Sequence, residues 1–169
     1  MFREMRRKNC ELSSETAEKI LREGIFGVLN LVGDGGYGYG VPINYAVENK
    51  KIYFHSATEG HKIDAIKNND KVSFCVVDKH EIVGKEFTSY FTSVIAFGKI
   101  KIISDNSNSE LRRGLELLSE KYCSEIPADR REKYIEGSLK SERVFVMVLE
   151  IEHLTGKAAR ELVRDGEIS

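Results

Sequence analysis

Several features are scarce in this sequence, and each scarcity narrows the class of protein. The three cysteines, Cys10, Cys75 and Cys123, are odd in number, far apart and without a C-x-x-C pair, which argues against a disulfide framework and a zinc knuckle. Basic and acidic residues nearly balance, at 26 and 27, for a net charge of −1, so no strong field attracts nucleic acid or anionic lipid. We expect free, buried thiols and no nucleic-acid partner.

Long apolar runs are also absent. No stretch is long enough to span a bilayer, and the basic start, Met1 to Lys8, is not followed by an apolar run of signal-peptide length. We therefore expect a cytoplasmic protein with no membrane partner. The 169 residues, 41% hydrophobic and 31% charged, contain no repeat or linker, so residues 1–169 are expected to form a single domain.

Motifs of hydrolytic enzymes are missing, because the chain has no G-x-S-x-G, no H-E-x-x-H and no carboxylate cluster spaced to a histidine. Gly33–Gly38 matches G-x-G-x-x-G, but a dinucleotide site needs a helix directly after it, and Tyr39–Ile43 alternates like a strand around Pro42. The pattern instead predicts a hairpin with Gly35 and Gly36 at positive φ. A protein that takes its reactivity from a cofactor needs no such motif.

Apolar periodicity gives the remaining elements. Period-two alternation predicts six strands, at Ile25–Val32, Tyr39–Val47, Lys51–Ala57, Lys71–Asp78, Tyr90–Ser104 and Arg143–Ile151. Helical spacing predicts helices at Ser13–Glu23, His61–Lys67, Ser107–Tyr122 and Asp129–Glu136. Most links between strands are too short for helical crossovers, so the predicted fold class is mainly β with flanking helices, built on a six-stranded antiparallel barrel.

Polar segments at strand ends are candidates for ligand binding. His55 and Ser56 end one strand, and Gly60 and Lys62 open the next helix, so hydroxyl, backbone N–H and ammonium groups converge where the helix dipole favours an anion. This arrangement is typical of a phosphate site, although such serines also cap helices. Two weaker candidates are Thr92–Val94, at the opening of a strand, and Thr155–Lys157, after the last predicted strand, where a turn into a tail is the structural alternative.

Six sequence blocks occur in a fixed order, at Met5–Lys8, Gly27–Leu29, Tyr39–Tyr45, Ile52–Ala57 with Gly60–Lys62, Ser93–Gly98 and Glu152–Lys157. Together they closely resemble the pyridoxamine 5′-phosphate oxidase-like FMN-binding split barrels, especially the nitroimidazole-resistance (Nim-type) branch. The resemblance covers nearly the whole chain. It implies a split β-barrel and a homodimer with FMN in each groove between the subunits.

The resemblance also implies which residues bind FMN. The strand around Pro42 would offer backbone groups to the isoalloxazine edge, while His55, Ser56 and Lys62 would hold the ribityl and phosphate groups. The full implied set is Val41, Pro42, Ile43, Asn44, His55, Ser56, Ala57, Lys62, Thr92, Ser93, Val94, Thr155, Gly156 and Lys157. The bidentate phosphate-binding arginine and the pyridoxal-binding signature of the larger oxidases are not found, so we expect a relative and not the oxidase itself.

The leading functional interpretation is an FMN-dependent reductase that passes electrons to a small electron-poor substrate such as a nitroaromatic ring. No catalytic residue and no metal site is assigned. One alternative is a non-catalytic flavin- or haem-binding module, in which His55, His61 or His153 faces a porphyrin. The other is a structural dimerisation domain with an empty groove.

Overall fold

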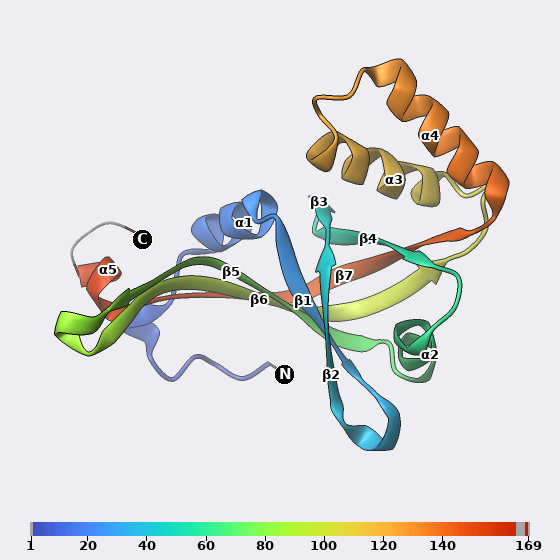
Figure 1. Ribbon diagram of the computed structural model, residues 1–169. Helices are drawn as coiled ribbons and strands as arrows, with labels where there is room; N and C mark the ends of the chain where they lie inside the picture. The colour runs from blue at the N-terminus through green and yellow to red at the C-terminus, as the bar shows by residue number, and fades with distance from the viewer. Residues whose placement is uncertain (1, 165–167, 169) are drawn as a thin grey trace.

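The computed structural model describes residues 2–164 and residue 168, which form one sheet with helices packed around it (Figure 1). The strands are β1 (Phe26–Val32), β2 (Gly38–Asn44), β3 (Ala46–Glu48), β4 (Lys51–Ala57), β5 (Lys71–Val83), β6 (Thr88–Ile103) and β7 (Val144–Ala158). The helices are α1 (Ser14–Glu23), α2 (His61–Asn68), α3 (Ser109–Tyr122), α4 (Ala128–Ser141) and α5 (Arg160–Arg164), with single 3₁₀ turns at Lys8–Cys10, Asp34–Gly36 and Gly84–Glu86.

The sheet closes through one bent strand. All neighbours pair antiparallel, in the order β2-β1-β5-β6-β7-β4-β3, and only Tyr45 separates the two edge strands β2 and β3. The chain therefore pairs with β1 before Tyr45 and with β4 after it. The predicted antiparallel barrel is confirmed. The strand count rises from six to seven because the predicted strand Tyr39–Val47 breaks at Tyr45 into β2 and β3.

A side chain from α3 fills this break. The Tyr45 backbone N–H donates to the Tyr122 hydroxyl at 3.0 Å, and that hydroxyl lies 2.7 Å from the Tyr45 carbonyl and 2.5 Å from that of Ile25. The Tyr45 ring is fully buried, and its own hydroxyl donates to the carbonyl of Leu21 at 2.6 Å; burial raises the pKa of Tyr45. Backbone groups released by the break thus find partners, as buried polar groups must.

The barrel interior is apolar, with Leu29, Phe54, Phe74, Val94 and Met147 all fully buried. Helices α1 and α2 each contribute an apolar stripe to this core, made of Ala17, Ile20 and Leu21 and of Ile63, Ala65 and Ile66. None of the helices in the described part of the chain is long and apolar enough to cross a membrane.

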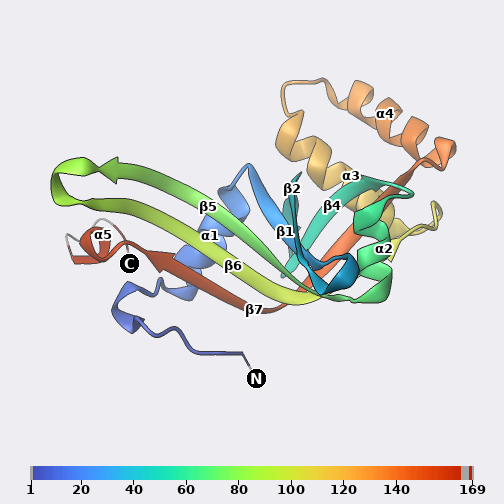
Figure 2. The same cartoon turned by 60° about the horizontal axis from the view of Figure 1, so that its bottom comes forward.

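Pairing across strands extends several elements beyond their predicted ends. The polar stretch 79–89, predicted to separate two strands, is mostly strand, so β5 and β6 form a long arm that projects from the barrel (Figure 2). Likewise β7 continues to Ala158, so Thr155–Lys157 lies inside a strand and not in a turn after it. The backbones of these polar segments pair with neighbouring antiparallel strands. Their local sequence does not indicate this pairing, because strand formation depends on the neighbouring strand as well as on the residues themselves.

Two further expectations need correction. Only Cys10 of the three free cysteines is buried; Cys75 is half-buried because its side chain points out of the barrel, and Cys123 is exposed at the end of α3. Helix α4 runs from Ala128 to Ser141 and so exceeds the predicted Asp129–Glu136. Its last turn packs on the sheet, with Leu139 against the cluster that contains Val146.

The glycine-rich turn is a hairpin, as predicted. Strands β1 and β2 pair in register from Phe26 opposite Asn44 to Val32 opposite Gly38. Gly35 and Gly36 have φ values of 66° and 80°, a region that costs most other residues roughly 1 kcal/mol or more. The glycines that match G-x-G-x-x-G therefore serve the geometry of a hairpin turn and not a dinucleotide-binding helix start.

Replacing Gly35 or Gly36 by alanine should lower the free energy of unfolding by about 1 kcal/mol each, because alanine strains at positive φ. The matched control is Gly84→Ala, at a turn glycine with no atom within 4 Å of an added Cβ and no positive φ. Urea titration monitored by circular dichroism measures the effect; equal stability of all three variants would contradict the hairpin strain.

Candidate functional site

One face of the sheet points away from the core and carries many predicted site residues. Directly paired residues of antiparallel strands lie on the same face, so the register defines rows across β2, β1, β5, β6 and β7. The central row is Pro42, Val28, Cys75, Ile95 and Thr155. We call this surface the outer face. Its residues are exposed or half-buried, whereas the alternating residues of the same strands are mostly buried.

The rows on either side continue the outer face. On the side toward the β5–β6 arm the paired residues are Phe26 with Asn44, and Val77 with Ser93 and Lys157. On the other side they are Gly40, Asn30, Ser73, Phe97 and His153. The face is notably apolar for exposed surface, since Phe26 is 63% and Val77 60% exposed. Monomeric proteins rarely leave such patches uncovered.

Strand alternation divides the predicted cofactor residues between two faces. Pro42, Asn44, Ser93, Thr155 and Lys157 belong to the outer face. Their neighbours in sequence alternate toward the barrel: Val41 and Ile43 pack against the core, and Thr92, Val94 and Gly156 are buried. The sequence analysis assigned all consecutive residues of each segment to the cofactor site. In the fold, only every second side chain of a strand reaches the same surface.

Two of the inward residues have structural partners. The Thr92 hydroxyl donates to Asp78 Oδ2 at 2.8 Å and accepts from the Lys79 N–H at 3.2 Å. These bonds stabilise β5 where its pairing with β6 shifts register between Val77 and Lys79. A Cβ at Gly156 would lie 2.9 Å from the Cβ of Leu12. Gly156 thus allows the segment before α1 to pack closely on β7.

A second group of predicted residues lies at the junction of β4 and α2. His55 and Ala57 are exposed, while Ser56 is 5% exposed and points inward. No hydrogen-bond partner of the Ser56 hydroxyl occurs among the residues that the structure describes. The pKa of His55 is nevertheless lowered, first because the surrounding protein partly desolvates the ring although one side of it faces solvent, and then because of the nearby Lys62 charge. Helix α2 starts after Gly60, which has no side chain to cap its N–H groups.

Within one protomer, the β4–α2 junction lies far from the predicted site residues on β7. His55 pairs with Val146 near the start of β7, whereas Thr155 and Lys157 lie near its end. Val146 and Thr155 are roughly 30 Å apart along the strand at 3.3 Å per residue. The β4–α2 junction therefore lies far from Thr155 and Lys157 in one chain, although α2 approaches the β1–β2 hairpin through His61 and Tyr39.

Sequence reasoning missed the apolar members of the outer face, Phe26, Val28, Cys75, Val77 and Ile95. A signal was present, because Ile25–Val32 and Lys71–Val77 carry apolar residues at both odd and even positions. Strands covered on both faces show such continuous apolar runs. Also missed was the stack of Tyr39 on His61, with ring centroids 4.2 Å apart, beside the β4–α2 junction.

Comparison with known protein families shows which family has this architecture. The model of the family described as pyridoxamine 5′-phosphate oxidase matches residues 13–158. The chain belongs to that family. The match spans both the outer face and the β4–α2 junction, which confirms the family resemblance of the sequence blocks. No curated protein matches the chain.

Solved structures share the fold of this family member at low sequence identity. A candidate 5-nitroimidazole antibiotic resistance protein from Bacteroides thetaiotaomicron is 24% identical, with 86% of this chain and 84% of that chain covered and a TM-score of 0.71. A conserved hypothetical protein from Mycobacterium tuberculosis is 16% identical, with 94% and 92% covered and a TM-score of 0.76. An FAD and heme binding protein from Mycobacterium smegmatis is 18% identical, with 94% and 80% covered and a TM-score of 0.68.

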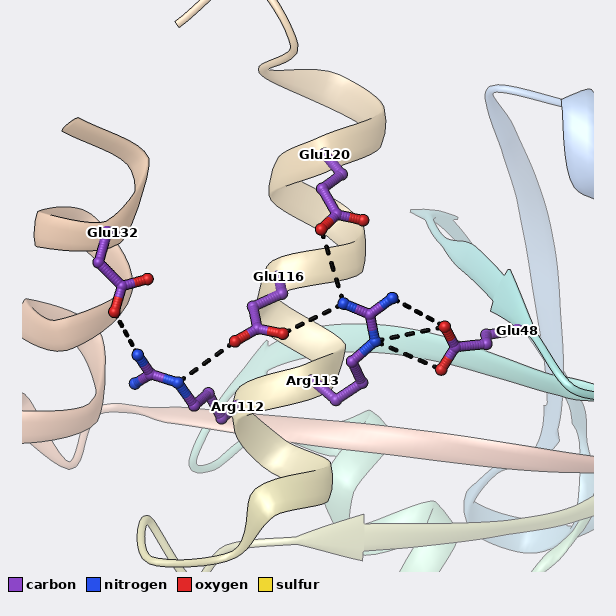
Figure 3. Close-up of polar contacts among 6 residues, drawn as sticks. All are labelled: Glu48, Arg112, Arg113, Glu116, Glu120 and Glu132. Atoms are coloured by element: carbon purple, nitrogen blue, oxygen red, sulfur yellow. Dashed lines mark hydrogen bonds and ion pairs between the residues drawn. The ribbon is translucent and has the colours of Figure 1, made fainter. Parts of the chain in front are cut away.

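A third polar feature of this family member is a charge network on α3 (Figure 3). Arg113 pairs with Glu48 of β3 at 2.8 Å and with Glu116 at 3.1 Å, and its hydrogen bond to Glu48 lowers the pKa of that carboxyl. Arg112 pairs with Glu116 at 3.2 Å and reaches Glu132 on α4. Because each arginine already binds carboxylates, the network joins α3 to β3 and α4 and is not an open anion site.

Proposed function

We propose that this chain is an FMN-binding flavoprotein that works as a homodimer and passes electrons from reduced FMN to a small electron-poor substrate, in the manner of a nitroimidazole reductase. The observation that carries the proposal is that one chain keeps the β4–α2 junction far from Thr155 and Lys157 of the outer face. The outer face is apolar and carries the polar groups of Asn44, Ser93, Thr155 and Lys157, while the β4–α2 junction offers the Lys62 ammonium and the uncapped start of α2. A flavin ring needs the first surface and a phosphate needs the second.

A two-fold partner would unite the two surfaces. A symmetric dimer presents the same patch on both subunits, so packing one outer face against another would cover Phe26 and Val77 and bring the β4–α2 junction of one chain toward the outer face of the other. Burying this apolar area favours association by roughly 25 cal/mol per Å². Membership of the family and the shared fold of the candidate nitroimidazole resistance protein support this arrangement.

The β4–α2 junction fits a phosphate. Lys62 supplies a positive charge, and the first N–H groups of α2 lie at the positive end of the helix dipole without a side-chain cap. The buried Ser56 hydroxyl lacks a partner among the described residues and would gain one from a ligand oxygen. The combination resembles a phosphate cradle with a lysine as its point charge.

The outer edge of β2 fits the polar edge of a flavin ring. β2 pairs with β1 on one side and is first in the strand order, so its other side presents backbone N–H and C=O groups. Pro42 lacks an N–H, which limits strand addition there by another chain. FMN, when bound, would supply the electron-transfer chemistry; the protein would hold the ring, shield it from water and leave one side open to a substrate.

The cofactor itself tests the proposal. We expect the purified protein to be yellow, to release FMN on denaturation, and to bleach when NADH or NADPH is added without oxygen, with recovery of the flavin band after a nitroaromatic acceptor is supplied. Release of FAD would correct the cofactor, and a colourless protein that is not stabilised by FMN would overturn the proposal. A Soret band would instead support a haem-binding module, a possibility favoured by the FAD and heme binding neighbour.

Replacing Lys62 by alanine should weaken FMN binding at least about tenfold, because a charge-assisted contact to phosphate contributes about 1.5 kcal/mol or more. Riboflavin, which lacks the phosphate, should bind nearly as before. The matched control is Lys67→Ala, which removes an exposed lysine from the last turn of the same helix. Flavin fluorescence titration measures both ligands, and equal losses for FMN and riboflavin would remove Lys62 from the phosphate site.

A further inference from the structure

The chain before α1 reaches onto the outer face that the proposed dimer would use. Its end is Phe2, whose ring stacks on the His153 imidazole with centroids 4.8 Å apart and planes at 9°. The same ring lies 5.7 Å from the ring of Phe97. Phe97 and His153 pair across β6 and β7 in one row of the outer face. An aromatic side chain of the same protomer therefore covers part of this face.

The other end of this segment is fixed to β7. Glu11 forms a single antiparallel bridge with Lys157, and Leu12 donates its N–H to a β7 carbonyl at 3.0 Å. Cys10 and Leu12 are buried, so the chain is anchored from Cys10 onward. We call residues 2–9 the strap. It runs from this anchor over the side of β6 and β7 opposite α1 (Figure 1).

The two contacts with β7 bracket a proposed flavin contact. The anchor meets β7 at Lys157 and Phe2 meets it at His153, with Thr155 midway between them in the strand. Thr155 and Lys157 are among the polar groups that the outer face offers to the flavin ring. A docked strap thus lies at the part of the outer face where the partner and the flavin are proposed to bind.

Phe2 holds the free end of the strap almost alone. Every strap residue except Met5 is exposed. Within the described residues the strap's one ion pair, Glu4 with Lys8 at 2.9 Å, is exposed on both sides. A surface hollow of about 520 Å³ lies between Phe2 and sheet residues such as Ser73, so the ring is not packed on all sides. Losing the Phe2 contact therefore frees the strap up to its anchor.

Two outer faces cannot pack together while a strap lies on each. Phe2 covers the row next to the central row of Ile95 and Thr155, so a partner placed on that row meets the ring first. We propose that the strap is an autoinhibitory contact, which opposes homodimer formation while Phe2 is docked on Phe97 and His153 and leaves this row when the partner covers it. The inference rests on the proposed function, because it concerns the dimer that builds the flavin site.

Symmetry doubles the effect of the ring on assembly. Each dimer has two outer faces, so two Phe2 rings must be released in one association event. A contact between aromatic rings favours the docked state roughly fivefold. Because the undocked fraction enters once for each subunit, the two straps together weaken the dimer roughly 30-fold.

Replacing Phe2 by alanine should therefore lower the dissociation constant of the dimer at least about tenfold. Phe2→Tyr keeps a ring that can stack and should retain the dissociation constant of the wild type. The control Tyr134→Ala removes an exposed ring from α4, away from the outer face, and should change nothing. Sedimentation velocity of the full chain, with and without FMN, measures the dissociation constant over dilutions that extend below the wild-type value.

Nuclear magnetic resonance reports the docking itself. Nuclear Overhauser effects between the ring protons of Phe2 and His153 should be present in the monomer, because the two rings are stacked there. They should disappear as the wild-type chain dimerises, since the partner then covers His153. Phe2→Tyr should show the same loss on dimerisation, which ties the release of the ring to assembly.

The possible failures separate the strap from the proposed function. A dimer whose dissociation constant is unchanged or raised in Phe2→Ala, or that keeps the contacts between the Phe2 and His153 rings, would overturn the strap and leave the proposed function standing. A chain that stays monomeric in the wild type and in Phe2→Ala alike, with and without FMN, would contradict the proposed dimer and the strap with it. A monomeric wild type that becomes dimeric in Phe2→Ala would support both.

Discussion

Replacing Gly98 by alanine should destabilise the protein by about 3 kcal/mol, at the upper end of what overpacking usually costs. A Cβ on this residue would overlap the carbonyl oxygen of Glu150 and lie 2.9 Å from the carbon of that carbonyl. The obstacle is backbone, and it sits where the pairing of β6 and β7 shifts between Phe97 and Gly98. No side-chain rotation relieves such a clash, so the two strands must move apart.

The melting temperature should fall by roughly 10 °C for a loss of this size in a chain of this length. Gly38→Ala is the matched control, because it also adds a methyl group to a strand glycine but meets no atom within 4 Å; its effect should stay within about 0.5 kcal/mol. Scanning calorimetry compares the two variants. Similar melting temperatures would show that β6 and β7 do not approach as closely at Gly98 as described.

Local chemistry made part of this fold predictable. The turn at Gly35 and Gly36 depends on backbone freedom that only glycine supplies at low cost, so its hairpin could be derived from adjacent residues. The break at Tyr45 could not, because its backbone groups are satisfied by Tyr122, which comes from α3. The lengths of β5 and β6 likewise depend on pairing between polar residues of 79–89, which no local pattern reveals.

The sequence was enough to predict which segments contribute to the candidate site. It was not enough to predict which side chains of those segments face the same surface. The runs around Pro42, His55 and Ser93 were found because they match the family's order of blocks. Which members share a surface depends on strand alternation and on the register shifts in β5 and β6. Thr92 shows the consequence, since it sits beside Ser93 in sequence but uses its hydroxyl to hold Asp78.

Replacing Ile95 by aspartate should convert the proposed dimer into a monomer and weaken FMN binding at least about a hundredfold. Ile95 lies at the centre of the outer face, between Cys75 and Thr155 in its row. Its side chain is half-buried in the single chain, so the carboxylate can reach water when the chain is alone. Packed against a partner, the same carboxylate would be buried without a counter-charge, which costs about 3 kcal/mol or more.

The change in FMN affinity follows from the assembly. If one chain supplies the β4–α2 junction and the other supplies the outer face, separating them removes part of every site, and 3 kcal/mol corresponds to roughly a hundredfold in affinity. The control Tyr134→Asp places a carboxylate at an exposed ring of α4, away from the outer face, and should stay dimeric and flavin-bound. Light scattering gives the mass, circular dichroism verifies folding, and fluorescence titration gives the affinity. A folded Ile95→Asp monomer that binds FMN at full strength would show that one chain holds the whole site, because the flavin would then need nothing that a second outer face provides.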